Sequence, residues 1–504
     1  MTGKTDAAPP GRSLTTAYRW YALGLLALIN LLNYLDRNVI FALFEPIKRD
    51  LGLTDTQLGW LGSAYILVFS VAALPFGVIS DLRSRRAVIA AGVTVWSAFT
   101  ALGAAVRNFG QLFICRAAVG IGEAAFGPAA ASLVADYFPG KGRAAAMGIL
   151  SSGIALGGVL GIGLGGVLEK HYGWRVAFLA VGIPGVLCAM AAARLVDPTR
   201  RPSTVTLRDF LAGRDGAVAM VRRDFVCTMI GAAAGLGAAV ALGQVYGADS
   251  KLDIAVFGAA VGLGLAGDIL RWVRLIQRGK VATTPLGGEL GGAIDDIVRA
   301  VKRVLATPTL IYVFVAGAMI SFGMNGIVGW GPTFIARELG LTSSQAATLL
   351  GKWGLLAGTA GTVFGGGLAD WLRRYTDQAR VITVALGLLI GAPAAIWLLT
   401  VRDQTIFIPV FFGAFFFLSW YNGPLTAVIF DVVPARVGGT VAGAYLLFIH
   451  LAGDAIAFPL VGALSDRFGI DRAVFVLPSM ALLGGLVVLG AIRTVGPDMK
   501  RMAE

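Results

Sequence analysis

The feature that most constrains the fold is a series of uncharged apolar runs, separated by short polar turns that carry Arg, Asp, Pro or Gly. Each run is about as long as a membrane span, roughly 20 residues. A bilayer admits only helices and closed barrels, because backbone polar groups in hydrocarbon need internal partners. The runs lack the alternation of barrel strands. The sequence therefore predicts an all-α polytopic membrane protein.

Composition supports this prediction, since 57% of the 504 residues are hydrophobic and only 14% are charged. That leaves too little polar surface to cover a soluble fold of this size. Twelve spans are expected, six on either side of a long linker. They lie near 20–44, 57–80, 86–106, 109–136, 144–168, 174–196, 309–336, 345–369, 380–401, 405–431, 437–463 and 472–494.

The two groups of six spans are related in sequence. The string LGLTDTQ at 51–57 recurs as LGLTSSQ at 339–345, at the same place in the span pattern. Two more matches occur in the same order: Gly77 and Asp81 with Gly366 and Asp370, and Gly127, Pro128, Asp136 and Pro139 with Gly423, Pro424, Asp431 and Pro434. Parallel repeats of this kind are typical of transporters whose site lies between two rocking bundles near the bilayer midplane.

These observations divide the chain into five parts: an N-terminal tail (1–19), a six-helix bundle (20–198), a linker (199–307), a second bundle (308–495) and a C-terminal tail (496–504). The linker is too long for an ordinary connection. We favour a transmembrane hairpin within it, near 225–246 and 254–275, over a soluble insert. An amphipathic pattern at 292–306 predicts a helix on the cytoplasmic surface.

Charge placement predicts the orientation. Arginines gather in the loops after the second and eighth spans and in the linker, which puts that side and both termini in the cytoplasm of a cell whose inner membrane holds the chain. The net charge of +13 then suits anionic membrane lipids better than nucleic acid. The chain has two histidines, no paired cysteine spacing and no phosphate-binding loop, so we expect no metal and no cofactor. We also expect the protein to be a monomeric transporter without enzymatic activity.

Seven ionisable residues lie inside apolar runs: Asp36, Arg37, Arg116, Glu123, Lys352, His450 and Asp454. Each charge near a helix centre costs roughly 2.5 to 3.5 kcal/mol, so these groups must pair or face water. A fixed ion-pair clamp between the first and fourth spans is one explanation. The other is a pH-responsive network, in which protonating Asp36 or Glu123 frees an arginine to hold an anionic group.

Several strings resemble the major facilitator superfamily: GVISDLRSRR after the second span, RAAVGIGEA from Arg116, and GWRVAF from Gly173. Leu82 and Ser84 depart from the first motif. NYLDRNVI from Asn33, ADYFPGKGR, GIPG and above all HLAGDAIAFPLVGALSD from His450 to Asp466 resemble its Spinster branch, whose transporters are associated with lysophospholipids and sphingosine 1-phosphate. The resemblance implies two six-helix bundles related by a pseudo-twofold axis, working by alternating access.

The resemblance also implies roles for residues. It predicts proton coupling at Asp36, Glu123, His450 and Asp454, and cytoplasmic gating at Gly77, Asp81, Arg85, Arg86 and Asp370. An amphiphile would be held by its charged head at Arg37 and Arg116. Further candidate contacts are Asn33, Tyr34, Lys352, Trp330, Trp420 and Tyr421, although membrane aromatics more often serve packing.

Two alternatives stay open. One keeps the transporter and changes the cargo to a sugar acid or another small organic anion, because organic-anion symporters carry strings similar to NYLDR and GIGEA. The other is a membrane sensor or scaffold that transports nothing and works through its linker. A scaffold should tolerate loss of the Glu123 carboxylate, whereas a proton-coupled carrier should not.

Overall fold

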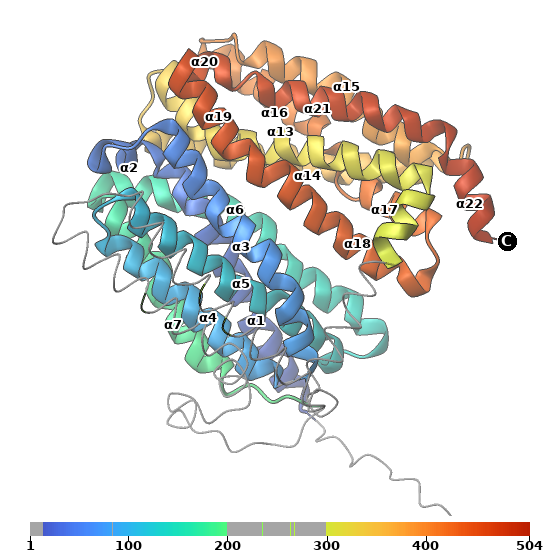
Figure 1. Cartoon of the computed structure of the whole chain (residues 1–504), viewed down its shortest axis with the longest axis horizontal. Coiled ribbons are helices and arrows are strands. Elements are labelled where there is room, and N and C mark those ends of the chain that lie inside the picture. Colours follow the sequence, from blue (N-terminus) through green and yellow to red (C-terminus); the bar gives the residue numbers. More distant parts are fainter. Residues whose placement is uncertain are drawn as a thin grey trace, which may run out of the picture.

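The computed structural model describes residues 14–82, 84–198 and 299–503, with isolated positions at 234, 263 and 267. In these ranges every regular element is helical (Figure 1). The first half contains α1 (Thr16–Ala42), α2 (Phe44–Leu51), α3 (Asp55–Leu82), α4 (Arg85–Leu102), α5 (Phe109–Tyr137), α6 (Arg143–Tyr172) and α7 (Trp174–Ala192). The second half contains α13 (Pro308–Glu338), α14 (Ser343–Leu372), α15 (Ala379–Leu398), α16 (Gln404–Leu418), α17 (Pro424–Val432), α18 (Ala435–Ile449), α19 (Ala455–Phe468), α20 (Ile470–Ala473), α21 (Val476–Leu489) and α22 (Val495–Ala503).

Eleven stretches of the described chain are long and apolar enough to cross a membrane. Of the twelve expected spans, only α14 is missing from these eleven, and it carries Lys352 within its 30 residues. Apart from the isolated positions 234, 263 and 267, the predicted hairpin lies outside the described residues, as does most of the linker. Residues 299–306 are helical. The predicted C-terminal tail contains α22, whose Asp498 carboxylate accepts a hydrogen bond from Thr309 N at 3.0 Å. The tail is therefore attached to the first turn of α13.

The duplicated LGLT string has the same structural role in both halves. Gly52 and Gly340 adopt left-handed backbone conformations, with φ of 63° and 66°, which end the preceding helix. The threonine hydroxyl two residues later accepts a hydrogen bond from the backbone N–H of the glutamine, Gln57 or Gln345, at 3.2 Å in each case. Each glutamine side chain bonds back to the threonine N–H, at 3.0 Å. The repeat is thus a helix stop followed by a capping box.

Small residues bring helices together inside the first half. Gly153, Gly157, Gly161 and Gly165 lie on one face of α6 and contact α1, as their spacing of four predicts. A Cβ on Gly157 would lie 2.5 Å from the carbonyl oxygen of Leu31, and one on Gly161 would lie 2.5 Å from that of Leu35. Any larger side chain at these positions would force α1 and α6 apart.

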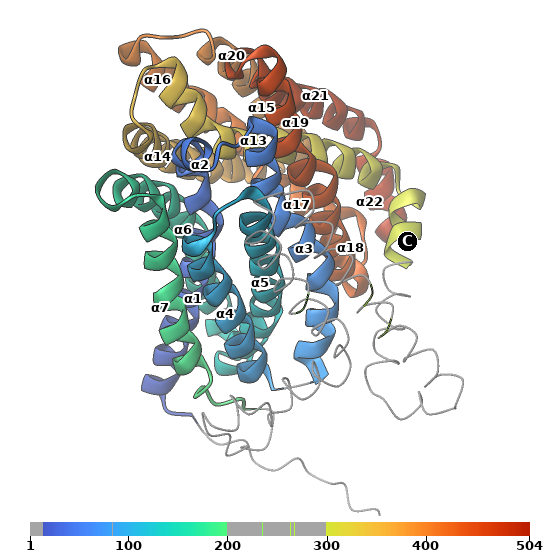
Figure 2. The ribbon, with the colours of Figure 1, turned by 60° about the vertical axis from the view of Figure 1, so that its left-hand side comes forward.

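The two halves form separate groups of helices, coloured blue to green and yellow to red (Figures 1 and 2). They meet along α3 and α19, and along α6 and α14. We call the end of the molecule that holds α2 and the starts of α3 and α14 the junction end; α1 begins at the opposite, far end. Among the described residues, every hydrogen bond between the halves lies at the junction end or between it and the middle of the bundle.

Apolar side chains fill the space between the halves next to the junction end. The rings of Phe41 and Phe458 stack with centroids 5.1 Å apart, and those of Phe44 and Trp330 lie 5.3 Å apart. Trp330 is fully buried, and its indole N–H donates to the Phe458 carbonyl at 3.1 Å. The indole hydrogen bond holds α13 to α19 within the second half, and the two ring contacts seal the halves together on this side.

Candidate functional site

The intramembrane charges of the first half form two ion pairs between α1 and α5. Arg116 Nη1 lies 3.1 Å from Asp36 Oδ1, and Arg37 Nε lies 2.6 Å from Glu123 Oε2. Both carboxylates and Arg116 are buried. The Thr100 hydroxyl donates to the other Asp36 oxygen. The pairing required by the cost of buried charge is confirmed, and each helix supplies one acid and one base.

Three aromatic rings surround the Arg37 guanidinium. Its Cζ lies 4.6 Å from the ring centroids of both Tyr34 and Phe69, and 5.6 Å from that of Tyr65. The Tyr65 centroid is also 5.7 Å from Arg116 Cζ. Cation–π attraction in a desolvated site adds about 2 kcal/mol per good contact, so Arg37 has a stable resting position when Glu123 is ionised.

Several buried atoms of this group have no hydrogen-bond partner in the described part of the chain. They are Arg116 Nε and Nη2, Glu123 Oε1 and Asn33 Nδ2. Buried polar groups are almost always satisfied by protein, water or ligand. The two free arginine donors suit an anionic acceptor, and the free Glu123 oxygen is where a proton would add.

The charged group of the second half is built around Asp454, which is 2% exposed. His450 Nδ1 lies 2.7 Å from its Oδ2. Asn325 Nδ2 donates to its Oδ1 at 2.9 Å, and the Ser321 hydroxyl donates to the same oxygen. Residues 450–454 form a π-helical turn, a feature common at functional sites. Ser321 and Asn325 were missed from sequence, although polar residues four apart in an apolar span of α13 were a usable signal.

The remaining predicted contacts do not join these two groups. Trp330 lies in the seal between the halves, and Trp420 is 6% exposed and packs against Gly365 and Gly387. Lys352 is exposed, its ammonium 4.8 Å from the centroid of the Trp353 ring. Tyr421 is partly buried. Their roles in binding remain predictions.

At the far end, one predicted gating arginine, Arg85, and one arginine that was not predicted, Arg380, bind acids that the sequence had matched only as repeat counterparts. Arg85 pairs with Asp136, and Arg380 pairs with Asp431. In each pair the acid follows the arginine by fifty-one residues. Arg86 donates to the Leu195 carbonyl at 3.3 Å. The Asp81 side chain is outside the described structure, and Asp370 is exposed without an ion pair to any described residue. Gly77 has open space where a Cβ would lie.

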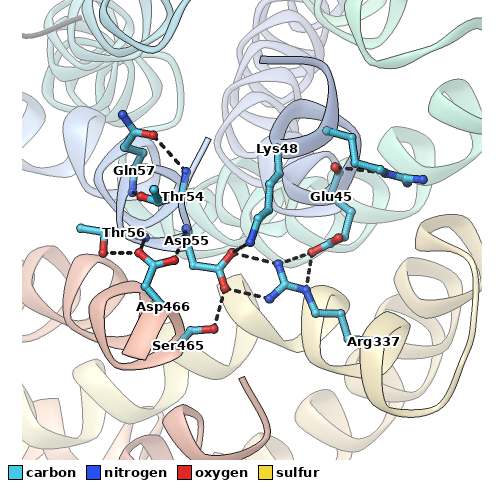
Figure 3. Close-up of polar contacts among 10 residues, drawn as sticks. Glu45, Lys48, Thr54, Asp55, Thr56, Gln57, Arg337, Ser465 and Asp466 are labelled. Atoms are coloured by element: carbon cyan, nitrogen blue, oxygen red, sulfur yellow. Dashed lines mark hydrogen bonds and ion pairs between the residues drawn. The ribbon is translucent and has the colours of Figure 1, made fainter. Parts of the chain in front are cut away.

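A network of charges at the junction end was not predicted (Figure 3). Arg337, near the end of α13, lies 2.6 Å from Glu45 and 2.7 Å from Asp55. Asp55 also pairs with Lys48 at 2.5 Å and accepts a hydrogen bond from the Ser465 hydroxyl at 2.5 Å. Because Arg337 and Ser465 belong to the second half and the others to the first, the network holds this end closed.

A second cross-half contact lies beside that network. The Asp466 carboxylate, near the end of α19, accepts hydrogen bonds from the backbone N–H groups of Asp55 and Thr56 at 2.8 and 2.9 Å. It also accepts one from the Thr56 hydroxyl at 2.6 Å. The second half thus supplies an acid that satisfies the free first-turn donors of α3.

Comparison with known proteins agrees with this architecture. The model of the Major Facilitator Superfamily matches residues 26–225 and 217–454. Protein spinster of Drosophila melanogaster is 24% identical over 461 residues, 89% of this chain and 62% of that protein. The probable galactarate/D-glucarate transporter GudP of Bacillus subtilis is 24% identical over 512 residues, 97% of this chain and 95% of that protein.

A solved structure has the same fold. The crystal structure of a bacterial homolog to the human lysosomal transporter Spinster, in an inward-facing and unoccupied conformation, superposes with a TM-score of 0.68 at 21% identity, covering 97% of this chain and 98% of that chain. The family match spans both halves, and the sequence resemblance to Spinster is confirmed by a relative that covers most of the chain. The chain belongs to the Major Facilitator Superfamily, with a Spinster protein among its relatives.

Proposed function

We propose that this protein is a proton-coupled secondary transporter that moves an amphiphile with an anionic head, of the lysophospholipid type, by alternating access. The observation that carries the proposal is the pair of buried acid–base contacts between α1 and α5, which leaves two Arg116 donors and one Glu123 oxygen without partners among the described residues. Such a site can exchange a proton for an anionic group without leaving a bare charge in the membrane.

The contacts support the following order of events. Protonation of Glu123 removes the negative partner of Arg37, which then turns toward an anionic head together with the free donors of Arg116. Deprotonation restores the pair between Arg37 and Glu123, and the head is released. The second carboxylate–arginine pair, Asp36 and Arg116, keeps the remaining charge balanced.

The tail of the amphiphile would lie toward the second half. That half contains the His450–Asp454 group, in which three side chains already contact the Asp454 carboxylate. Histidine changes charge in the physiological pH range, so His450, whose side chain is 34% exposed, is a second candidate proton site.

A small organic anion is the second candidate cargo, because a relative is described as a galactarate/D-glucarate transporter. That cargo has no apolar tail and would need polar partners from both halves. It predicts competition by hydrophilic anions and none by lysolipids. The Spinster-like strings favour the amphiphile.

Replacing Glu123 with glutamine tests the coupling. Glutamine keeps the shape but removes the titratable oxygen, so an imposed pH gradient should no longer accelerate uptake into proteoliposomes, a loss of roughly tenfold. Exchange of cargo down its own gradient should continue. The matched control is Glu338→Gln, which breaks a peripheral pair with Arg402 of 3.0 Å and should leave the pH response intact.

Uptake by the Glu123→Gln protein that still rises with the pH gradient would contradict the coupling role. Absence of cargo uptake by both the unmodified protein and the variant, in every assay, would instead favour the sensor or scaffold.

A further inference from the structure

The junction end contains two seams that the sequence duplication makes equivalent. In the first seam, α19 packs on the start of α3; in the second, α6 packs on the start of α14. A Cβ on Gly462 would lie 2.8 Å from the Cα of Thr56, and a Cβ on Gly166 would lie 2.9 Å from the Cα of Ser344. Thr56 and Ser344 are the sixth residues of the LGLT repeats. The same close contact is therefore made twice.

The two seams differ in the charge that lies one helical turn beyond the glycine. Four residues after Gly462 comes Asp466, whose carboxylate binds the first-turn donors of α3. Four residues after Gly166 comes Lys170. In the second seam, α6 therefore carries a cation, Lys170, at the position where α19 carries the anion Asp466 in the first seam.

The start of α14 has the same capping box as the start of α3, but no carboxylate of the described residues takes the place of Asp466. Ser343 and Ser344 are each only 9% exposed, yet neither hydroxyl has a hydrogen-bond partner among the described residues. Both line an open cleft of about 490 Å³ between the halves, together with Arg49, Lys170 and Arg337.

The charge of the cleft favours an anion. Arg337 is neutralised by Glu45 and Asp55. Arg49 and Lys170 form no ion pair with a described residue, although Arg49 Nε donates a hydrogen bond to the Glu45 carbonyl at 3.4 Å. Among the described lining residues, Glu169 is the one carboxylate without such a pair. Two cations and the positive end of a helix dipole thus face one carboxylate.

We propose that this cleft binds an oxyanion, a phosphate or carboxylate group, which takes the place that the Asp466 carboxylate fills in the equivalent seam. Arg49 and Lys170 come from the first half and the serines from the second, so the site is complete only while the junction end is closed. A bound anion would therefore stabilise that conformation and slow its opening. This site is separate from the proposed cargo site and does not depend on the cargo.

Hydrogen exchange of the complete protein in detergent tests the proposal, with inorganic phosphate as the probe and chloride at equal ionic strength as the reference. Phosphate should slow amide hydrogen exchange at the start of α14 about tenfold, because these amides exchange only after the bound phosphate has dissociated. The same measurement in nanodiscs with and without phosphatidylglycerol distinguishes a lipid head group from free phosphate. A response to either one supports the site and identifies its source.

Two substitutions at one exposed position sharpen the test. Lys170→Gln should reduce the anion response to less than about twofold. Lys170→Asp should mimic Asp466, so that exchange is slow without phosphate and no longer responds to it. Arg467→Gln, which removes a cation from the other seam, is the matched control and should respond as the unmodified protein does. No response to either anion source, or an equal response in Lys170→Gln, would overturn the proposal.

Discussion

Replacing Gly59 with leucine is expected to stop transport almost completely, by preventing the junction end from closing. A Cβ at Gly59 would lie 2.2 Å from the carbonyl oxygen of Phe458 and 2.7 Å from the Cα of Pro459. Both are backbone atoms of α19, so no side-chain rotation can relieve the overlap. Overpacking of this kind costs about 1–3 kcal/mol or more. We expect at least a tenfold fall in the rate of cargo uptake into proteoliposomes.

The control is Gly163→Leu on α6, where a Cβ would meet no atom within 4 Å. That variant should transport normally. Hydrogen exchange at the start of α3 should rise in Gly59→Leu, because Asp466 can no longer reach the Asp55 and Thr56 donors. Transport at the normal rate by a folded Gly59→Leu protein would show that closure of this seam is not part of the cycle.

Replacing Arg337 with glutamine is expected to shift the protein strongly toward opening at the junction end. Arg337 is the only residue of the described structure that binds both Glu45 and Asp55 across the halves. Without it, Asp55 keeps Lys48 and Ser465, while Glu45 has no charged partner among the described residues. Charge-assisted hydrogen bonds contribute about 1.5–3 kcal/mol each, and less when partly exposed as here.

That energy predicts a shift of roughly tenfold in the ratio of open to closed junction, which hydrogen exchange at α2 and the start of α3 would detect. Transport should fall by a similar factor, because one of the two alternating states is depleted. The control, Arg402→Gln, removes an arginine of the same end whose partner, Glu338, is in its own half. Equal exchange in Arg337→Gln and in the unmodified protein would mean that the network does not hold the halves together.

Much of the architecture could be predicted from sequence because membrane helices are recognisable by length and apolarity. The duplication was visible in LGLTDTQ and LGLTSSQ, and the glycine face of α6 in its spacing. Pairing between the charges of α1 and α5 could be predicted because four unpaired charges in the hydrocarbon region would cost too much free energy. The individual partners, such as Arg37 with Glu123, depend on helix rotation and depth and needed the structure.

The junction network could not be predicted, because charges at span ends are what any membrane protein shows. Glu45, Asp55 and Arg337 gain meaning only when the two halves are placed together, and they are 282 or more residues apart across that contact. One signal was available: the repeats differ at Asp55 and Ser343, where the first carries an acid and the second does not. The π-helical turn at residues 450–454 could not be predicted either, because no residue pattern in the sequence marks it.

The measurement that tests proton-coupled amphiphile transport most directly is uptake of labelled lysophospholipid into proteoliposomes, with and without an imposed pH gradient. We predict saturable uptake that depends on the protein, is accelerated by the gradient, and loses that acceleration in Glu123→Gln. Glucarate should compete little. Absence of lysophospholipid movement under both conditions, with glucarate transported instead, would contradict the amphiphile assignment while leaving the superfamily fold in place.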